Sequence, residues 1–564
     1  MDVSFGTIWE AIARAQPEAV AISDPERDYS YAEFEERSAR LAAALAAAGV
    51  GPGDQVACYQ YNGAAYLETV FAAFKLGAVP VNVNYRYTSE ELSALLADAD
   101  AAALVFSGAL AGNVARAACD SGFPSLRLLV RVGPAVGPAV GPAVGRAPAG
   151  EEQELAGVLE LEEVLAAHQP RPAEPRPGSD QLFMYTGGTT GRPKGVIWRL
   201  SDLMHSMEVS VFQRLGVAAL PGTLQEAVAV AAAARVAGKT PVMLPVVPLM
   251  HATGLFNAMG VLLAGGRIVT TRPGGLDPPH VWETVARQRV RTLVVAGNAV
   301  CQPLVDELRA AERAGRPYDL SSLDSVVSSG TVFSDRLKRA LHERASVTIT
   351  DAIASSEGGP FAYAVTRSVD DLPARFFPAA ATRVLAGDQP VADGDGQVGV
   401  LAFSGPIPLG YYKDAGKTTA TFRTVDGVRY TMPGDLAVVE PDGAIRFLGR
   451  GSGVINTGGE KVHAQEVEDA LLAHPDVTDA SVIGVPDETW GERVMAVVAT
   501  ASTALTAAEL QDAVRSRLAG YKVPRGIVLL PSLPRTASGK LELAQVRRIV
   551  AAQAPEAPEP DASA

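Results

Sequence analysis

Helical and apolar segments alternate in the N-terminal part of the chain, and this alternation limits the folds that the sequence can adopt. Ala- and Leu-rich helical stretches from Thr7 to about Val130 are separated by short apolar runs, the clearest at residues 78–83 and 102–106. Between these runs, Thr88 and Glu91 form a capping box that predicts a helix over residues 89–96. Strands that alternate with helices are typical of a parallel sheet covered by helices. The sequence therefore predicts an α/β fold.

The chain is too long for one hydrophobic core, since it has 564 residues. We expect a large multi-lobed N-terminal domain over residues 1–450, with parallel sheets flanked by helices. After Arg450 the pattern changes to a compact unit of about 110 residues, within the usual size of a domain. This change predicts a separate C-terminal domain over residues 451–551.

The C-terminal unit has a mixed order of helices and strands. Its first predicted helix carries Val467, Ala470 and Leu471 on one side and ends before Pro475, and its second opens with a capping box at Thr506. The predicted strands are residues 480–485, 494–500 and 527–530, and the second helix ends at Gly520. This order indicates an α+β domain.

Two segments are not expected to do catalytic work. Residues 133–145 repeat Gly-Pro-Ala-Val and can bury little apolar surface, which favours a surface insertion. Residues 552–564 are rich in alanine, proline and acidic residues and are predicted to be a disordered tail.

Charge and composition exclude several classes of partner. The formal net charge of −14 argues against binding to nucleic acid and against a basic helix on a membrane surface. The apolar stretch 246–266 contains His251, Asn257 and several glycines, so we expect buried core and no membrane insertion. Cys58, Cys119 and Cys301 fit no metal or disulfide spacing, which predicts buried thiols and a cytoplasmic protein. The N-terminus lacks the features of a secretory signal, and a homodimer is compatible with the sequence.

A loop rich in glycine, threonine and basic residues lies between Tyr185 and Val196. Its sequence is Tyr-Thr-Gly-Gly-Thr-Thr-Gly-Arg-Pro-Lys-Gly-Val. Glycines let the backbone N–H groups approach an anion closely, and the threonine hydroxyls and Lys194 add donors and charge. Arg192 and Pro193 separate Gly191 from Lys194, so the loop does not match the Walker pattern. We interpret it as a phosphate cradle, in preference to a Gly/Thr hairpin without function.

This loop resembles the signature of the adenylate-forming superfamily, which includes acyl-CoA and aryl-CoA synthetases, luciferases and the adenylation domains of peptide synthetases. The resemblance covers nearly the whole chain. It implies a two-domain fold whose small C-terminal domain is mobile, although the spacing alone also allows a rigid appendage.

The resemblance assigns residues to the phosphates of ATP and to Mg²⁺. The phosphate loop comprises Thr186, Gly187, Gly188, Thr189, Thr190, Gly191 and Lys194. In Ser355-Ser356-Glu357, the resemblance implies that Glu357 helps to hold Mg²⁺ together with Thr186. A hard cation favours such oxygen ligands. Taken alone, Ser-Ser-Glu is more typical of a helix cap.

Further residues are implied for the ribose and the adenine. Asp435, in Tyr-Thr-Met-Pro-Gly-Asp, and Arg450 match the family's ribose contacts, although Pro-Gly-Asp alone is typical of a turn. The residues implied near the adenine are Gly330, Ile353, Ala354, Ser355 and Ser356. Where the family usually has an aromatic residue and a glycine, this chain has Ile353 and Ala354. The adenine is therefore expected to lose an aromatic stacking partner worth roughly 1–3 kcal/mol.

Lys540 is the best single candidate for a catalytic residue. The segment Pro-Arg-Thr-Ala-Ser-Gly-Lys that ends at Lys540 resembles the one whose lysine bridges the substrate carboxylate and the α-phosphate. A compact ammonium can follow the developing charge better than an arginine fork can. Taken alone, a lysine in such a segment is more often a solvated surface residue.

The resemblance also implies a CoA thiol acceptor. Ser452 falls at the hinge about which the family's C-terminal domain rotates, and Gly458 and Gly459 match a glycine-rich loop that lines the pantetheine passage. A branch of actinobacterial acyl-CoA and steroid-acid CoA synthetases looks similar at this point.

The acid substrate is expected beside residues 248–254. His251 is predicted to border the acyl or aryl group, and a core histidine bonded to a carbonyl is the alternative. Met250, Leu255 and Phe256 favour a hydrophobic pocket.

Three functions follow from these features. The leading hypothesis is a two-step acid–CoA ligase that uses ATP, Mg²⁺ and CoA to activate a fatty, steroid side-chain or aryl acid. Alternatives are a diazotase-type enzyme that activates nitrite for transfer to an aryl amine, and an enzyme that loads an acid onto a carrier protein. A catalytically dead homologue is disfavoured because Lys194, Glu357, Asp435, Arg450 and Lys540 are all present.

Overall fold

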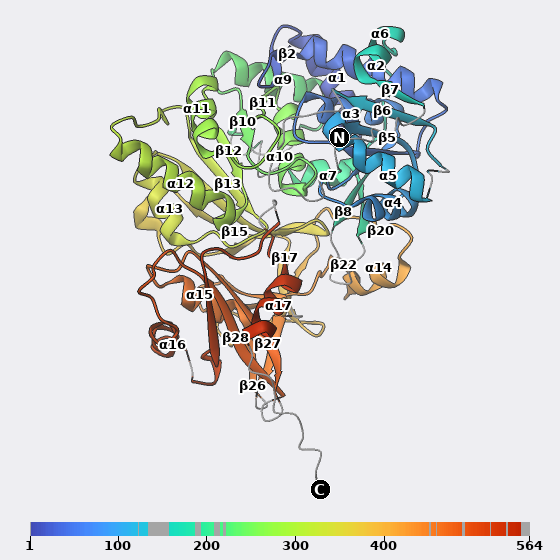
Figure 1. Cartoon of the computed structure of the whole chain (residues 1–564). Helices are drawn as coiled ribbons and strands as arrows, with labels where there is room; N and C mark the ends of the chain where they lie inside the picture. The colour runs from blue at the N-terminus through green and yellow to red at the C-terminus, as the bar shows by residue number, and fades with distance from the viewer. Residues whose placement is uncertain are drawn as a thin grey trace.

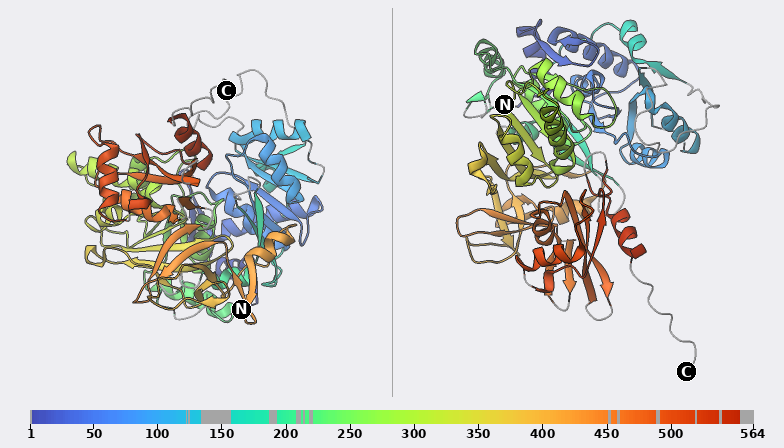
Figure 2. Two further views of the ribbon diagram at one scale, coloured as in Figure 1. Left: turned by 90° about the horizontal axis from the view of Figure 1, so that it is seen from below. Right: turned by 60° about the vertical axis from the view of Figure 1, so that its left-hand side comes forward.

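The computed structural model describes residues 2–121, 123, 125–133, 157–186, 193–207, 212, 215–217, 221–450, 453–457, 460–487, 491–518, 520–536 and 540–553. Two large lobes lie side by side, and a smaller C-terminal unit is set against them (Figure 1). Seen from below, the C-terminal unit covers the lobe that contains α11–α13 more than the lobe that contains α2–α6 (Figure 2).

One lobe is built on an eight-stranded sheet in the order β20-β9-β8-β4-β3-β5-β6-β7. Its strands are β3 (Gln55–Tyr59), β4 (Val79–Asn82), β5 (Ala101–Ser107), β6 (Leu128–Val132), β7 (Val158–Glu160), β8 (Gln181–Thr186), β9 (Lys194–Arg199) and β20 (Gly410–Tyr411). Its helices are α2 (Tyr31–Ala47), α3 (Ala64–Leu76), α4 (Ser89–Asp98), α5 (Ala111–Ser121), α6 (Leu161–Ala167) and α7 (Leu200–Ser206). Strands β3 to β8 pair in parallel, whereas β9 and β20 pair antiparallel at one edge. The predicted strands at 78–83 and 102–106 are confirmed, as is the capping box of Thr88 and Glu91.

The other lobe is built on a nine-stranded sheet in the order β16-β15-β14-β13-β12-β10-β11-β1-β2. Its strands are β1 (Val20–Ser23), β2 (Asp28–Ser30), β10 (Val242–Pro245), β11 (Arg267–Val269), β12 (Thr292–Val295), β13 (Ser325–Ser329), β14 (Thr348–Ser355), β15 (Gly358–Thr366) and β16 (Phe377–Pro378). Its helices are α1 (Phe5–Ala15), α9 (Leu224–Val236), α10 (Ala252–Leu263), α11 (Pro278–Gln288), α12 (Gly297–Arg313) and α13 (Asp335–His342). The central strands are parallel and buried, which fits their short apolar runs.

The third sheet of the N-terminal part differs from the expectation of parallel sheets, because all its pairs are antiparallel. Its strands are β17 (Thr382–Ala386), β18 (Gln389–Pro390), β19 (Gly399–Phe403), β21 (Phe422–Val425), β22 (Val428–Thr431), β23 (Asp435–Val439) and β24 (Ile445–Arg450), and helix α14 (Ala415–Thr421) precedes β21. The reason is local turn chemistry. Asp426 and Gly427 have φ angles of 49° and 79° and join β21 to β22 in a two-residue hairpin.

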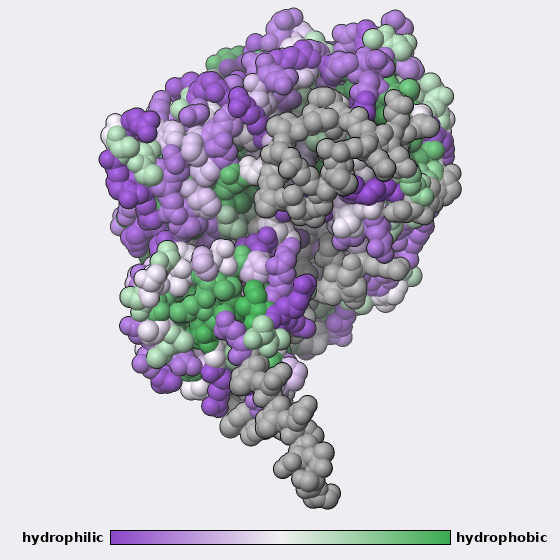
Figure 3. Space-filling view, in the orientation of Figure 1, coloured by the Kyte–Doolittle hydropathy of each residue, from purple (hydrophilic) through white to green (hydrophobic). Residues whose placement is uncertain are grey.

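The C-terminal unit has its own five-stranded sheet, in which β26, β25, β28 and β27 pair antiparallel and β29 adds in parallel to β28. Its elements are β25 (Val454–Thr457), β26 (Glu460–His463), α15 (Ala464–Leu472), β27 (Asp479–Asp487), β28 (Gly491–Ala499), α16 (Ala507–Arg515), β29 (Gly526–Leu530) and α17 (Leu543–Gln553). The predicted helices and strands of this unit are all present, with the capping box at Thr506. Its face in Figure 3 carries a contiguous apolar area, whereas the visible faces of the lobes are mainly hydrophilic.

The C-terminal end of the chain and one of the three cysteines differ from the sequence-based expectation. Helix α17 continues to Gln553, because Val546 and Val550 pack into the core at helical spacing, so residues 552 and 553 are not part of a disordered tail. Cys58 and Cys301 are buried, but Cys119 is exposed on α5. The Gly-Pro-Ala-Val repeats after residue 133 and the tail after residue 553 lie outside the described residues.

The apolar stretch 246–266 forms buried core, as predicted. Most of α10 within it is buried against the sheet that contains β10 and β11. No helix in the described part of the chain has the length and apolar character needed to cross a membrane.

Candidate active site

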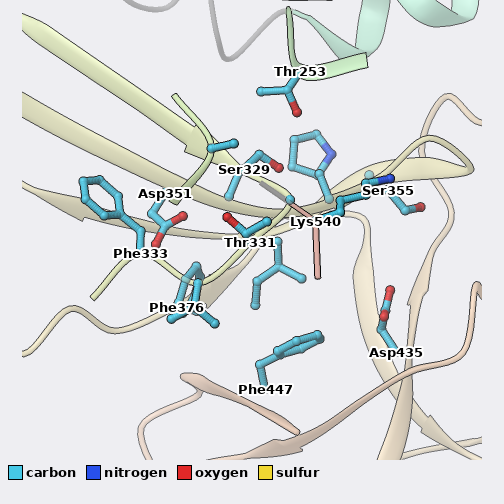
Figure 4. A pocket seen from close by; sticks show the side chains of 18 of the residues that line it. Thr253, Ser329, Thr331, Phe333, Asp351, Ser355, Phe376, Asp435, Phe447 and Lys540 are labelled. Atoms are coloured by element: carbon cyan, nitrogen blue, oxygen red, sulfur yellow. The ribbon is translucent and has the colours of Figure 1, made fainter. Parts of the chain in front are cut away.

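A large cavity of about 2060 Å³ lies where the two lobes and the C-terminal unit meet. Its wall includes Thr186 from β8, Glu357 from the turn after β14, Asp435 from β23 and Lys540 from the C-terminal unit. Figure 4 shows Lys540 and Ser355 near the middle of this cavity, with Asp435 and Phe447 on its lower side. Residues from distant parts of the sequence are therefore brought to one site.

The phosphate loop connects the antiparallel strands β8 and β9, in which Thr186 lies opposite Lys194. Gly187, Gly188, Thr189, Thr190 and Gly191 lie outside the described residues. Thr186 lines the cavity, but Lys194 does not: its Nζ lies 3.4 Å from Oδ2 of Asp414, just before α14. To reach a phosphate in the cavity, the Lys194 ammonium has to leave this carboxylate.

Glu357 occupies the turn between the antiparallel strands β14 and β15 and not a helix cap. Glu357 is only 7% exposed, and its Oε1 accepts a hydrogen bond of 2.8 Å from the hydroxyl of Tyr411. Among the described residues, no cation pairs with this carboxylate. A buried carboxylate without a counter-charge is costly, so this site suits a bound cation.

Glu357 alone cannot complete a metal site. The described residues contain no group of three or more His, Cys, Asp or Glu side chains that could hold a metal ion. Mg²⁺ keeps few protein ligands and takes the others from phosphate and water oxygens. The cavity therefore fits Mg²⁺ that arrives with a nucleotide: Glu357 and the phosphates would hold it, and Thr186 also lines the cavity.

The two residues implied for the ribose lie on one β-hairpin. Asp435 begins β23 and lies directly opposite Arg450, the last residue of β24. Asp435 is buried and lines the cavity. Of Arg450, the structure describes the backbone only. The carboxylate of Asp435 can accept hydrogen bonds from two adjacent hydroxyls of a ligand.

The residues implied for the adenine line the same cavity. Gly330 follows β13, and Ile353, Ala354, Ser355 and Ser356 lie on or directly after β14. The turn is fixed by Trp198, whose Nε1 donates a hydrogen bond of 2.9 Å to the backbone oxygen of Ser356. Phe447 of β24 also lines the cavity, and both Phe447 and Ile353 pack at the edge of the largest core. Phe447 therefore places an aromatic ring in the wall of the cavity that Ile353 also lines.

Lys540 is held near the cavity by a short β-bridge between Arg535 and Leu541. Its backbone N–H donates to the hydroxyl of Thr536 over 3.1 Å, and its backbone oxygen accepts from the N–H of Thr536 over 2.7 Å. Arg535 is fixed in turn by Asp479, at 2.5 Å. The backbone of Lys540 is thus anchored while its side chain is exposed to the cavity.

His251 precedes α10 and lines the cavity. Burial, with smaller contributions from the charges of Lys540 and Arg86, lowers the pKa of His251 to about 3. Its Nε2 is buried and has no hydrogen-bond partner among the described residues. The neutral imidazole therefore keeps one polar atom available to a ligand, and no carbonyl is bonded to this nitrogen in the described part of the chain.

The cavity that His251 lines also carries apolar side chains. The apolar side chains at this wall are Met184, Trp198, Met207, Val247, Met250 and Phe256. The rings of Trp198 and Phe256 pack edge to face, with centroids 6.0 Å apart. Ser452, Gly458 and Gly459 lie outside the described residues, so their predicted roles stay predictions.

Sequence reasoning missed Tyr411, Asp414 and Phe447. Tyr411 and Asp414 follow Gly410, and the only local signal was a strand-like pair of tyrosines before the Asp414 helix cap. Phe447 and Gly449 alternate along β24, a spacing that places both on one face of a strand.

Residues 9–412 match the AMP-binding enzyme family, and residues 466–540 match the AMP-binding enzyme C-terminal domain. The chain belongs to the AMP-binding enzyme family. This agrees with the adenylate-forming resemblance, although the predicted boundary between residues 450 and 451 stays a prediction.

Relatives with known names cover almost the whole chain. It is 37% identical over 547 residues to 3-oxocholest-4-en-26-oate–CoA ligase of Rhodococcus rhodochrous, covering 93% of this chain and 92% of that protein. It is 33% identical over 552 residues to feruloyl-CoA synthase of an Amycolatopsis species, covering 95% and 97%.

Solved structures share the fold. The anthranilate CoA ligase AuaEII in complex with anthranoyl-AMP has a TM-score of 0.80 at 21% identity, covering 98% of both chains. The amide bond synthetase McbA of Marinactinospora thermotolerans has a TM-score of 0.76 at 24% identity, covering 97% of this chain and 99% of that one.

Proposed function

We propose that this protein is an ATP-dependent acid–CoA ligase. In the first step a carboxylate attacks the α-phosphorus of ATP, which gives an acyl-adenylate and pyrophosphate. In the second step the CoA thiol attacks the acyl carbon and AMP leaves. Membership of the AMP-binding enzyme family and the acid–CoA ligase names of the relatives support both steps. The cytoplasm supplies ATP and CoA, so we propose a cytoplasmic location.

One observation carries the proposal: Lys540 of the C-terminal unit lines the same cavity as Thr186, Glu357 and Asp435 of the N-terminal part. A cation that approaches from one side and oxygen groups on the other form a site for a nucleotide phosphate with its metal ion.

Each charged residue is assigned one task. Asp435 accepts hydrogen bonds from the ribose hydroxyls and thereby fixes the α-phosphorus in the cavity, with Arg450 beside it. Lys540 lies between the carboxylate and the α-phosphate and stabilises the charge that develops there. Glu357 would hold Mg²⁺, which neutralises charge on the phosphates as pyrophosphate leaves. The Lys194 ammonium leaves the Asp414 carboxylate and binds a phosphate of the nucleotide.

The acid is proposed to be bulky and largely apolar, such as a steroid side-chain acid or a fatty acid. The apolar wall that includes Trp198, Met207 and Phe256 supports this class, because few polar groups there would need partners. His251 is neutral at working pH and can accept or donate one hydrogen bond near the reacting carboxyl group. The names of the relatives support the same class.

The test is a pyrophosphate-release screen of the purified protein with ATP, Mg²⁺ and a panel of steroid, fatty and aryl acids, with and without CoA. We expect acid-dependent release of pyrophosphate, followed by CoA consumption that matches AMP formation. If AMP forms with nitrite and an aryl amine but without any carboxylic acid, the protein is a nitrite-activating enzyme and the ligase proposal is wrong. Acid-dependent pyrophosphate release with transfer only to a carrier protein would overturn the assignment of CoA.

A further inference from the structure

The Glu357 backbone is held in place by its neighbours, whereas its carboxylate has one hydrogen-bond partner among the described residues. Trp198 holds the turn through the Ser356 oxygen, and Gly358 next to it has a φ of 141°. A Cβ at Gly358 would lie 2.5 Å from the Cγ2 of Thr431, so the turn packs closely against β22 and only glycine fits at this position. Of the described residues, Tyr411 alone forms a hydrogen bond with the Glu357 side chain.

Tyr411 is itself rigidly placed. It belongs to β20, where it pairs with Val196 of β9, and it is only 6% exposed. Its ring packs edge to face against Phe422 with centroids 6.0 Å apart, and Lys417 Nζ lies 4.3 Å from the centre of the ring. Its backbone N–H donates to the Thr418 hydroxyl over 2.9 Å. The hydroxyl of Tyr411 therefore reaches Glu357 from a fixed direction.

A neutral donor at this point has a specific chemical consequence. A hydroxyl satisfies one lone pair of Oε1 but leaves the negative charge of the carboxylate in place. A lysine or arginine there would neutralise the charge and compete with a metal ion. Hydrogen-bond partners of this kind orient carboxylates that bind metal ions, and removing them typically weakens metal binding about 10- to 100-fold.

We propose that Tyr411 is a positioning residue, which orients the Glu357 carboxylate for the divalent cation that arrives with ATP. The proposal rests on the proposed function, since it takes Glu357 as the metal-binding group. It adds a residue on β20, 54 positions along the chain from Glu357. Tyr411 acts only through Glu357 and does not touch the cation.

The test removes the hydroxyl and keeps the ring. Tyr411→Phe preserves the packing on Phe422 and Lys417, so its thermal midpoint should stay close to that of the wild type. Binding of Mn²⁺ is measured by electron paramagnetic resonance in the presence of a non-hydrolysable ATP analogue. We expect the Mn²⁺ affinity to fall about 10-fold in Tyr411→Phe. Tyr412→Phe is the matched control, because the Tyr412 hydroxyl bonds Asp100 at 2.7 Å.

A double-mutant cycle separates positioning from a structural effect. In a Glu357→Gln background, Tyr411→Phe should cause little further loss of Mn²⁺ affinity, because the carboxylate through which it acts is absent. In the ligase assay, Tyr411→Phe should raise the Mg²⁺ concentration needed for half-maximal rate more than it lowers the rate at saturating Mg²⁺.

Wild-type Mn²⁺ affinity in Tyr411→Phe would overturn the proposal, and so would equal losses in the wild-type and Glu357→Gln backgrounds. If Tyr411→Phe lowers the thermal midpoint, the cycle still decides, because a general loss of stability would be additive with Glu357→Gln. Failure of the proposed function is distinguishable. A wild-type protein that binds Mn²⁺ with the ATP analogue but releases no pyrophosphate with any acid would refute the ligase and leave the positioning role of Tyr411 standing.

Discussion

Asp435 and Arg450 lie directly opposite each other in the antiparallel pair β23–β24. If Asp435 binds the ribose hydroxyls, Asp435→Ala should lower the affinity for ATP by about 10- to 150-fold, since hydrogen bonds to a charged group contribute about 1.5–3 kcal/mol. The effect should appear in KM for ATP more than in kcat. Asp388→Asn is the control, because Asp388 pairs with Arg423 in the same sheet and neither residue lines the cavity. Equal KM values for wild type and Asp435→Ala would remove the ribose assignment.

Lys540→Ala should reduce the rate of acid-dependent pyrophosphate release by about 10²–10³, the range for loss of a group that stabilises the transition state. The side chain is exposed, so the fold should be unaffected. Lys540→Arg should recover little activity, because a planar fork differs from a compact ammonium. Arg548→Ala removes an exposed cation from α17 and serves as the control. Adenylation by Lys540→Ala at the wild-type rate would refute the catalytic assignment.

Phe447 offers the aromatic surface that Ile353 does not. If its ring stacks on the adenine, Phe447→Ala should make the free energy of ATP binding less favourable by roughly 1–3 kcal/mol, which lowers the affinity about 5- to 150-fold. Phe447→Tyr should bind ATP as the wild type does. Isothermal titration with a non-hydrolysable ATP analogue measures this. Phe377→Ala provides the comparison, since Phe377 on β16 is 48% exposed and does not line the cavity. Unchanged affinity for ATP in Phe447→Ala would show that the Phe447 ring does not stack on the adenine, which would then contact aliphatic side chains only.

His251 makes stability depend on pH. Burial lowers its pKa to about 3 in the folded protein, against about 6.5 in an unfolded chain. The unfolded state therefore binds more protons between these values, so this contribution to stability is complete above pH 6.5 and is lost as the pH falls towards 3. Urea unfolding of His251→Gln at pH 7 and pH 4.5 should show a smaller loss on acidification than the wild type shows. His205→Gln, at an exposed position on α7, should behave as the wild type does. A wild-type-sized loss in His251→Gln would contradict the burial of a neutral ring.

Features that depend on neighbouring residues could be predicted from the sequence. The capping boxes at Thr88 and Thr506 placed the starts of their helices correctly, because a hydroxyl and a glutamate three residues apart define a helix start locally. The parallel strands β4 and β5 followed from apolar runs that suit strands buried on both faces. Lys540 and Asp435 were found through their motifs, and both line the cavity.

Features that depend on long-range pairing could not be predicted. The direction of the Lys194 side chain towards Asp414 follows from the antiparallel addition of β20 to β9, which no local pattern encodes. The hydrogen bond from Tyr411 to Glu357 likewise requires two different sheets to meet. The antiparallel third sheet depends on turns such as Asp426-Gly427, a local hairpin signal that gives the direction of one strand pair but not the order of the whole sheet.

Different secondary-structure elements supply different parts of the cavity wall. Met184, Trp198, Met207, Val247, Met250 and Phe256 come from β8, β9, α10 and the segments next to α7 and α10, whereas Asp435 comes from β23 and Lys540 from the C-terminal unit. Side chains such as Met207 and Phe256 can therefore be enlarged or trimmed without moving Asp435 or Lys540. Libraries confined to these apolar positions should yield enzymes with new acid preferences and an unaltered demand for ATP.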